Sequence, residues 1–224
     1  MKLHGAFCSL LALAGVVGCC PAQISPAKGG GYLFRVKYTK GQTMRFQTES
    51  TVANKGSKSS GMSFKAPMTI QVLNVVKGVA TVNVTKGAGT LNGQPFGKSE
   101  SVHAQLDETD SSSINGPQVP LKPIQTGGTW KAIRAVSFGG PPQNLNAVYR
   151  FQGFKTVDGH KVAVVVYSLT GAASGAGTML LQTNDASIYS NEILISVPSV
   201  DKFSKLRILM TRLPEQKVVH QPRN

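Results

Sequence analysis

The stretch that decides the fold is Val148-Tyr-Arg-Phe-Gln-Gly-Phe-Lys-Thr-Val157, then Asp158-Gly159, then His160-Lys-Val-Ala-Val-Val-Val-Tyr-Ser-Leu169. Both longer runs are rich in β-branched and aromatic residues, which is typical of strands. Both residues of the Asp-Gly dipeptide can adopt the positive φ that a two-residue hairpin turn requires. The segment therefore predicts an antiparallel hairpin.

The same signals continue on the N-terminal side of this hairpin. Residues 32–39 alternate Tyr32, Phe34, Val36 and Tyr38 with more polar side chains, as a half-buried strand does. A turn follows at Lys40-Gly41, a second hairpin covers 68–85 around Lys77-Gly78, and Asn92-Gly93 marks a further turn. The polar segment from Ser99 to Ser113 fits either a strand with a loop or one short helix.

On the C-terminal side, we expect a small-residue loop at 171–177, a hairpin over 178–197 that turns at Asn184-Asp185, and a last strand at 205–213. That strand places Leu206, Ile208 and Met210 on one face. About ten strands joined by hairpins predict an all-β fold with at most one short helix. The expected arrangement is an antiparallel meander forming a strongly curved sheet, an open barrel or a sandwich.

The N-terminus has the pattern of an export signal. Lys2 precedes the apolar run from Ala6 to Val17, which is too short to cross about 30 Å of hydrocarbon. Val16-Val17-Gly18-Cys19 resembles a bacterial lipobox, which implies lipid attachment at Cys19. The alternative is a cut after Ala22 that leaves a soluble, secreted protein.

These boundaries divide the chain into four parts. We expect a lipoprotein-type signal peptide at 1–18, a flexible tether at 19–31, a single β-rich domain at 32–213 and a charged tail at 214–224. The cysteines Cys8, Cys19 and Cys20 all lie at the N-terminus. The β-rich part therefore holds neither a disulfide nor a cysteine zinc site.

The charge of the chain is strongly positive, +14 at pH 7. Within 28–65 only Glu49 opposes the basic residues, and this cluster favours anionic neighbours such as phospholipid heads, lipopolysaccharide or acidic polymers. The alternative is an ordinary solvated basic surface. Nucleic acid is not expected, because the cations are spread over many strands without a recognition helix or aromatic motif. The cluster consists of Lys28, Arg35, Lys37, Lys40, Arg45, Lys55, Lys58 and Lys65.

No residue pattern indicates catalysis, a metal or a cofactor. His103 lies near Asp107, Glu108 and Asp110, but this spacing matches no familiar ligand pattern and fits a solvated acidic strip better. His160 follows a turn and is expected at a hairpin edge. The sequence contains no Gly-x-Ser-x-Gly elbow, and the Ser-x-x-Lys runs at 25–28 and 199–202 are not accompanied by Ser-Asp-Asn or Lys-Thr-Gly. Gly175-Ala-Gly177 lacks the third glycine of a dinucleotide loop.

The larger apolar side chains leave two interpretations open. Trp130 either faces a ligand or, as we favour, anchors the core or a loop. Five other large apolar residues are expected in the core. If the sheet curled without closing, they would instead line an apolar groove. These candidates are Met44, Phe46, Met68, Met179 and Met210.

Three short motifs carry a family resemblance. They are Tyr38-Thr-Lys-Gly-Gln-Thr-Met-Arg-Phe46, Pro123-Ile-Gln-Thr-Gly-Gly-Thr-Trp130 and Ser174-Gly-Ala-Gly177. With the lipobox, the chain resembles a domain-of-unknown-function family of exported bacterial β-rich lipoproteins over residues 32–200. Its architecture is similar to open-barrel envelope lipoproteins of the LolA/LolB and LppX-like groups, which implies lipid carriage. No motif of those carriers matches, so no ligand-binding residue is transferred from them.

The sequence thus predicts a non-enzymatic lipoprotein of the cell envelope, anchored at the outer membrane through Cys19. It would bind an apolar or amphiphilic ligand, or serve a structural or assembly role. One alternative is a surface module that binds acidic polymers through its basic face. A second alternative is a hydrolase whose site is assembled from distant residues.

Overall fold

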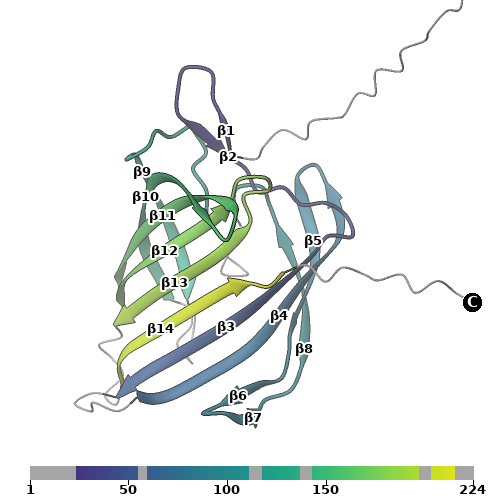
Figure 1. Ribbon diagram of the computed structural model, residues 1–224, viewed down its shortest axis with the longest axis vertical. Helices are drawn as coiled ribbons and strands as arrows, with labels where there is room; N and C mark the ends of the chain where they lie inside the picture. The colour runs from purple at the N-terminus through teal and green to yellow at the C-terminus, as the bar shows by residue number, and fades with distance from the viewer. Residues whose placement is uncertain (1–23, 55–59, 111–117, 137–142, 197–202, 215–224) are drawn as a thin grey trace, which may run out of the picture.

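The protein is all-β in its computed structural model, which describes residues 24–54, 60–110, 118–136, 143–196 and 203–214 (Figure 1). These residues form fourteen strands and no helix. In the described part of Ser99 to Ser113, strand β8 is followed by a turn, as the alternative of a strand with a loop predicted. The ten longer strands match the expected number, and β1, β2, β6 and β7 are additional short ones. The strands are β1 (Ile24–Pro26), β2 (Tyr32–Phe34), β3 (Thr43–Asn54), β4 (Ser60–Val76), β5 (Val79–Lys86), β6 (Gly89–Leu91), β7 (Gln94–Phe96), β8 (Glu100–Leu106), β9 (Thr129–Val136), β10 (Gln143–Val157), β11 (His160–Gly171), β12 (Ser174–Gln182), β13 (Ile188–Ser196) and β14 (Phe203–Arg212).

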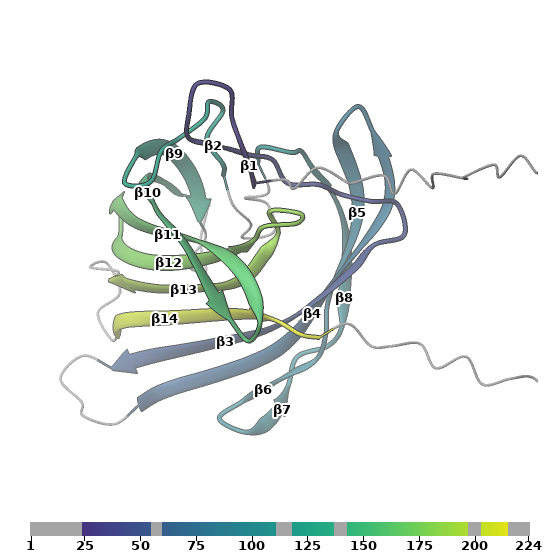
Figure 2. The same ribbon diagram turned by 45° about the horizontal axis from the view of Figure 1, so that its top comes forward.

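Twelve strands form one antiparallel sheet that curls strongly without closing (Figure 2). One meander runs from β9 through β10, β11, β12 and β13 to β14, and a second runs from β3 through β4 and β5 to β8. The last strand, β14, pairs with the first strand of the sheet, β3, and so joins the two meanders. The order would be circular if β8 paired with β9, and these two strands are instead edges of the sheet.

The hairpin turns agree with the sequence prediction. Lys77-Gly78, Asn92-Gly93 and Asp158-Gly159 all have positive φ at both positions. The pair at Asp158 has φ of 49° and 77°, as a tight hairpin turn requires. The longest hairpin, β10–β11, pairs Val157 with His160 next to the turn and Leu145 with Gly171 at its far end.

Residues 24–38, which include β1 and β2 and are called the N-terminal segment below, lie across one end of the curled sheet, at the top of Figure 1. Phe34, Val36 and Tyr38 are buried as the alternation predicts, but only Tyr32–Phe34 forms a strand. After Phe34 the backbone makes single hydrogen bonds to distant parts of the chain: the Val36 N–H donates to the Glu108 carbonyl and the Lys37 N–H donates to the Asp185 carbonyl. The alternation here reflects a chain that crosses the end of the sheet, where one side faces the core.

The predicted flexible tether, residues 19–31, is wrong in its second half. Ile24–Pro26 pairs with β2, and the Ile24 side chain is buried against the core. Gly29, Gly30 and Gly31 all have positive φ and form the turn between these strands. The predicted signal peptide 1–18, the lipid attachment site Cys19 and tail residues 215–224 lie outside the described residues.

The predicted small-residue loop at 171–177 is also wrong, because strand β12 already begins at Ser174. The small residues have a packing role instead. A Cβ on Gly177 would lie 2.5 Å from the Tyr167 ring and 2.6 Å from the Glu192 carbonyl oxygen. The absent side chain allows Tyr167 to lie across its pairing partner on β12. None of the described residues builds a helix long and apolar enough to span a membrane.

Candidate functional site

A cavity of about 440 Å³ is lined by residues of β3, β4, β11, β13 and β14 and by residues at the β6–β7 hairpin. Its volume falls in the range of small-molecule sites, roughly 300–1,000 Å³. Most of its wall is aliphatic or aromatic and comes from β4, β11, β13 and β14. The apolar lining consists of Phe64, Ala66, Pro67, Met68, Leu169, Ile193, Ile195, Ile208 and Met210, with Phe96 at the β6–β7 hairpin.

The proposed core residues divide between two places. Met44, Phe46 and Met179 are buried in the core, as predicted. Met68 and Met210 are also buried, but they line the cavity. For these two methionines, the structure agrees with the alternative that core candidates line an apolar groove in an unclosed sheet.

One wall of the cavity is polar, and its centre is Arg134 on β9. This side chain is only 5% exposed. Tyr167 on β11 and Asn191 on β13 line the same wall, and the Tyr167 hydroxyl donates to Asn191 Oδ1 over 2.8 Å. Arg134 also lies close enough to the hydroxyls of Tyr149 and Tyr167 to act on both electrostatically.

The strand register explains how Arg134 enters the interior. Side chains alternate between the faces of a strand, so Trp130, Ala132 and Arg134 share the inner face of β9 while Ile133 is 61% exposed. Ala132 pairs with Ala147 between the Arg134–Leu145 and Trp130–Tyr149 pairs. Two small side chains there leave room for the long arginine to extend toward the tyrosines.

Arg134 forms no ion pair with the described acids, although Asp110 lies near enough to act on the neighbouring Tyr149 hydroxyl. Among the described residues, no carboxylate oxygen lies within the 4.0 Å of an ion pair from its guanidinium. A buried ion without a counter-charge is costly, by several kcal/mol in real proteins. Such an arrangement persists in a protein mainly where the charge has a use.

The two tyrosines beside Arg134 are held neutral. Burial raises the pKa of Tyr167 to about 12, although the nearby Arg134 charge opposes the rise. Burial likewise raises the pKa of Tyr149, again opposed by Arg134. The Tyr149 hydroxyl is buried beside Arg134 and donates to no acceptor among the described residues.

Trp130 anchors both core and loop, which is the interpretation that the sequence favoured. Its ring stacks on Tyr149 with centroids 5.2 Å apart, and its indole N–H donates to the Gln118 carbonyl over 2.9 Å. Phe34 also packs against the Trp130 ring, with centroids 6.3 Å apart. The polar wall is thus fixed by an aromatic cluster that continues into the closed end of the sheet.

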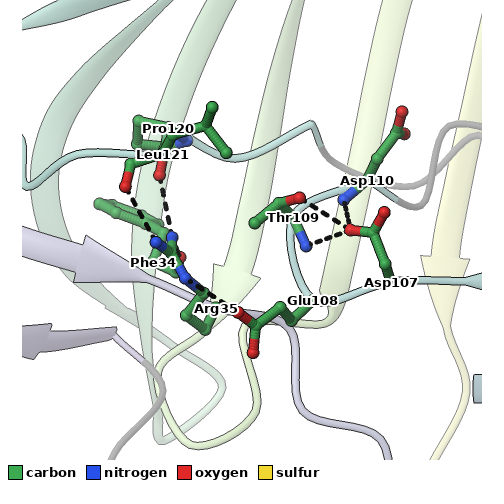
Figure 3. A network of polar contacts seen from close by, with 8 residues as sticks. All are labelled: Phe34, Arg35, Asp107, Glu108, Thr109, Asp110, Pro120 and Leu121. Carbon is green, nitrogen blue, oxygen red and sulfur yellow. Dashed lines mark hydrogen bonds and ion pairs between the residues drawn. The ribbon is translucent and has the colours of Figure 1, made fainter. Parts of the chain in front are cut away.

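The acidic residues 107–110 form part of the structural framework (Figure 3). Asp107 Oδ1 accepts bonds from the Thr109 hydroxyl and from the backbone N–H groups of Thr109 and Asp110. Burial raises the pKa of Asp107, but these bonds outweigh it and hold the pKa below 3.8. His103 points away on exposed β8, and the described residues contain no group of three such side chains placed to hold a metal.

The basic cluster of residues 28–65 is partly used in internal contacts. Arg35 donates to the carbonyls of Pro120 and Leu121 and pairs with Glu108 at 3.4 Å, as Figure 3 shows. Lys65 pairs with Glu49 at 2.6 Å. Lys55 and Lys58 lie outside the described residues. At least two of its eight cations therefore do not form a free basic face.

The remaining sequence candidates lie away from the cavity. His160 is exposed at the start of β11, and its ring lies 5.8 Å from that of Tyr189. Asp158 and Asp185 occupy turns, as predicted, and Asp185 also pairs with the buried Arg212. Ser25 to Lys28 spans β1 and the following turn, while Ser199 to Lys202 falls outside the described residues.

Sequence reasoning missed Arg134, and one signal could have found it. In Thr129-Trp-Lys-Ala-Ile-Arg134, the two large apolar side chains, Trp130 and Ile133, lie on opposite faces of the strand. Hydrophobicity alone therefore does not decide which face is buried, because the face with Trp130 also carries Arg134. An inward Trp130 requires an inward Arg134, since the two positions are four residues apart on one strand.

Comparison with other proteins adds no assignment. The sequence matches no protein-family model, and no curated protein shows significant similarity to it.

Proposed function

We propose that the chain is a non-enzymatic lipoprotein of the cell envelope whose unclosed sheet holds an apolar or amphiphilic ligand. The observation that carries this proposal is the cavity of about 440 Å³, with an apolar lining drawn from several strands. Because β8 and β9 do not pair, the sheet stays open, and side chains need not fill the whole of its interior. The aromatic side chains of the N-terminal segment fill one end, and the cavity remains for a ligand.

The mouth of the cavity also suits an amphiphile. Lys86 and Lys98 are exposed at the rim and outnumber Glu100. Phe96, 52% exposed, packs edge-on against Phe64 at 6.0 Å. A largely apolar cavity with one polar wall and lysines at its mouth favours molecules with an apolar chain and a polar or anionic part.

Mass spectrometry of lipids extracted from the full chain, purified from its natural host, tests ligand binding. We expect a co-purifying amphiphile. Ile208→Trp, which adds bulk inside the cavity, should remove it, whereas Leu194→Trp on the outer face should retain it. No lipid with the native chain, or equal lipid in both variants, would contradict the proposal.

The membrane anchor is a separate part of the proposal and rests on the lipobox at Val16–Cys19. Cys19→Ala should abolish incorporation of labelled fatty acid and release the protein from the membrane fraction. Cys20→Ala, its neighbour, is the matched control and should stay labelled. A Cys19→Ala protein that is still labelled and sedimented would show that the anchor lies elsewhere, whereas an unlabelled native chain would favour the cut after Ala22.

A further inference from the structure

We infer that the ligand is a single-chain amphiphile with an anionic head, and that Arg134 binds this head inside the cavity while the chain occupies the apolar part. This inference rests on the proposed function and specifies its ligand. It needs a site built for a negative charge, and three independent features provide one.

The first feature is the buried guanidinium itself. Arg134 lines the cavity at 5% exposure, and the described carboxylates all lie beyond ion-pair distance. An arginine offers several N–H donors in a planar fork that matches the two oxygens of a carboxylate or phosphate. A bound anion would supply the missing counter-charge.

The second feature is the side chain of Asn191, which is 6% exposed and lines the same cavity as Arg134. Its Oδ1 accepts the proton of the Tyr167 hydroxyl over 2.8 Å, so its amide N–H groups are the remaining donors. Arg134 and Asn191 therefore both present N–H donors to the cavity.

The third feature is the division of the cavity wall. Arg134, Tyr167 and Asn191 lie on β9, β11 and β13, and the last two strands also contribute Leu169, Ile193 and Ile195. The wall formed by β4 and β14 is mainly apolar, with Thr48 and Ser50 of β3 between these strands. Its apolar side chains are Phe64, Ala66, Met68, Ile208 and Met210. A head group at the polar wall would leave its chain against the aliphatic one. The volume suits one chain better than the two chains of a phospholipid, since it lies at the low end of ligand-site volumes.

The native fluorescence of Trp130 gives a direct binding assay, because it is the only tryptophan and stacks on Tyr149. The full chain, stripped of lipid, is titrated with hexadecanoic acid, hexadecyl phosphate and hexadecanol, which share one chain and differ in the head. We expect one or both anions to bind about ten- to a hundredfold more tightly than the alcohol, the usual gain from a charged hydrogen bond. The stronger of the two anions identifies carboxylate or phosphate as the head.

Arg134→Gln should remove this preference and leave alcohol binding within about threefold of native. The matched control is Lys131→Gln, which deletes one positive charge from the exposed face of the same strand and should keep the preference. Asn191→Asp keeps the acceptor for the Tyr167 hydroxyl but replaces the amide donors with a negative charge, so it should reduce the preference at least about two- to tenfold. This variant carries the test if Arg134→Gln fails to fold by thermal unfolding.

The failures are distinguishable. If no probe binds, both the proposed function and this inference are overturned. Equal binding of acid, phosphate and alcohol overturns the anionic head but keeps the apolar ligand. An anion preference that survives Arg134→Gln, or that Lys131→Gln removes equally, overturns the role of Arg134.

Discussion

Gly177→Ala should destabilise the protein more than its size suggests, because the position has no room for a methyl group. The new Cβ would lie 2.5 Å from the Tyr167 ring and 2.6 Å from the Glu192 carbonyl oxygen. Overpacking of this kind costs about 1–3 kcal/mol. Displacing Tyr167 also disturbs its bond to Asn191, worth about 0.5–1.5 kcal/mol.

The total loss is about 2–4 kcal/mol of unfolding free energy, or roughly 5–15 °C in Tm for a chain of this length. Urea unfolding of native and variant protein measures it. Gly159→Ala is the comparison, because it meets no atom within 4 Å and is penalised only through its φ of 77°, by about 1–2 kcal/mol.

A double variant separates the two contacts of the new methyl group. In a Tyr167→Leu background the ring is absent, so Gly177→Ala should cost about 1–2 kcal/mol less, while its contact with the Glu192 carbonyl remains. An unchanged midpoint in Gly177→Ala, or the same cost with and without the Tyr167 ring, would refute the reasoning.

Three further predictions concern side chains that hold the fold. Asp185→Ala removes the ion pair between the Asp185 and Arg212 side chains, which are 15% and 8% exposed, and the hydrogen bond from the Ser187 N–H. Urea unfolding should therefore show a loss of about 2–4 kcal/mol. Glu192→Ala is the control, because its ion pair with Arg207 lies at the exposed surface, and it should change stability by less than about 0.5 kcal/mol. The pKa of Asp107 is lower in the folded state, so its stabilisation is complete above pH 3.8 and is lost as pH falls through the lowered folded value; the stability difference from Asp107→Asn should shrink over that acidic range. The pKa of Tyr167 is raised from 10 to about 12, so its stabilising contribution is complete below pH 10 and is lost as pH rises toward 12; tyrosinate absorbance should show this group ionising later than an exposed tyrosine, and ionisation near pH 10 in the folded protein would contradict its burial.

The fold class was predictable because its signals are local. Alternating side chains and the dipeptides Lys77-Gly78 and Asp158-Gly159 predict strands and turns within a few residues of each other. The pairing of β3 with β14 was not predictable, since nothing in either strand identifies a partner so remote in sequence. The curl of the sheet depends on that pairing, so the choice among curved sheet, barrel and sandwich stayed open.

The candidate site was less predictable than the fold. Arg134 is one cation among 24 lysines and arginines, and neither its burial nor its distance from acids is visible in the sequence. The approach to Tyr149 depends on the Ala132–Ala147 pair, which forms across two strands. By contrast, the acids around His103 stood out in the sequence and proved to be a hydrogen-bonded turn at Asp107.

The join between β3 and β14 has a consequence for the order of folding. Each meander consists of neighbouring hairpins, which form on a scale of microseconds. Pairing Thr51 with Arg207 instead requires closing most of the chain into a loop, and such non-local contacts slow folding. During synthesis, β3 must wait for β14, the last of the described strands to emerge. We therefore expect the complete sheet to form only after β14 has left the ribosome, with the unpaired edge of β3 exposed to aggregation until then.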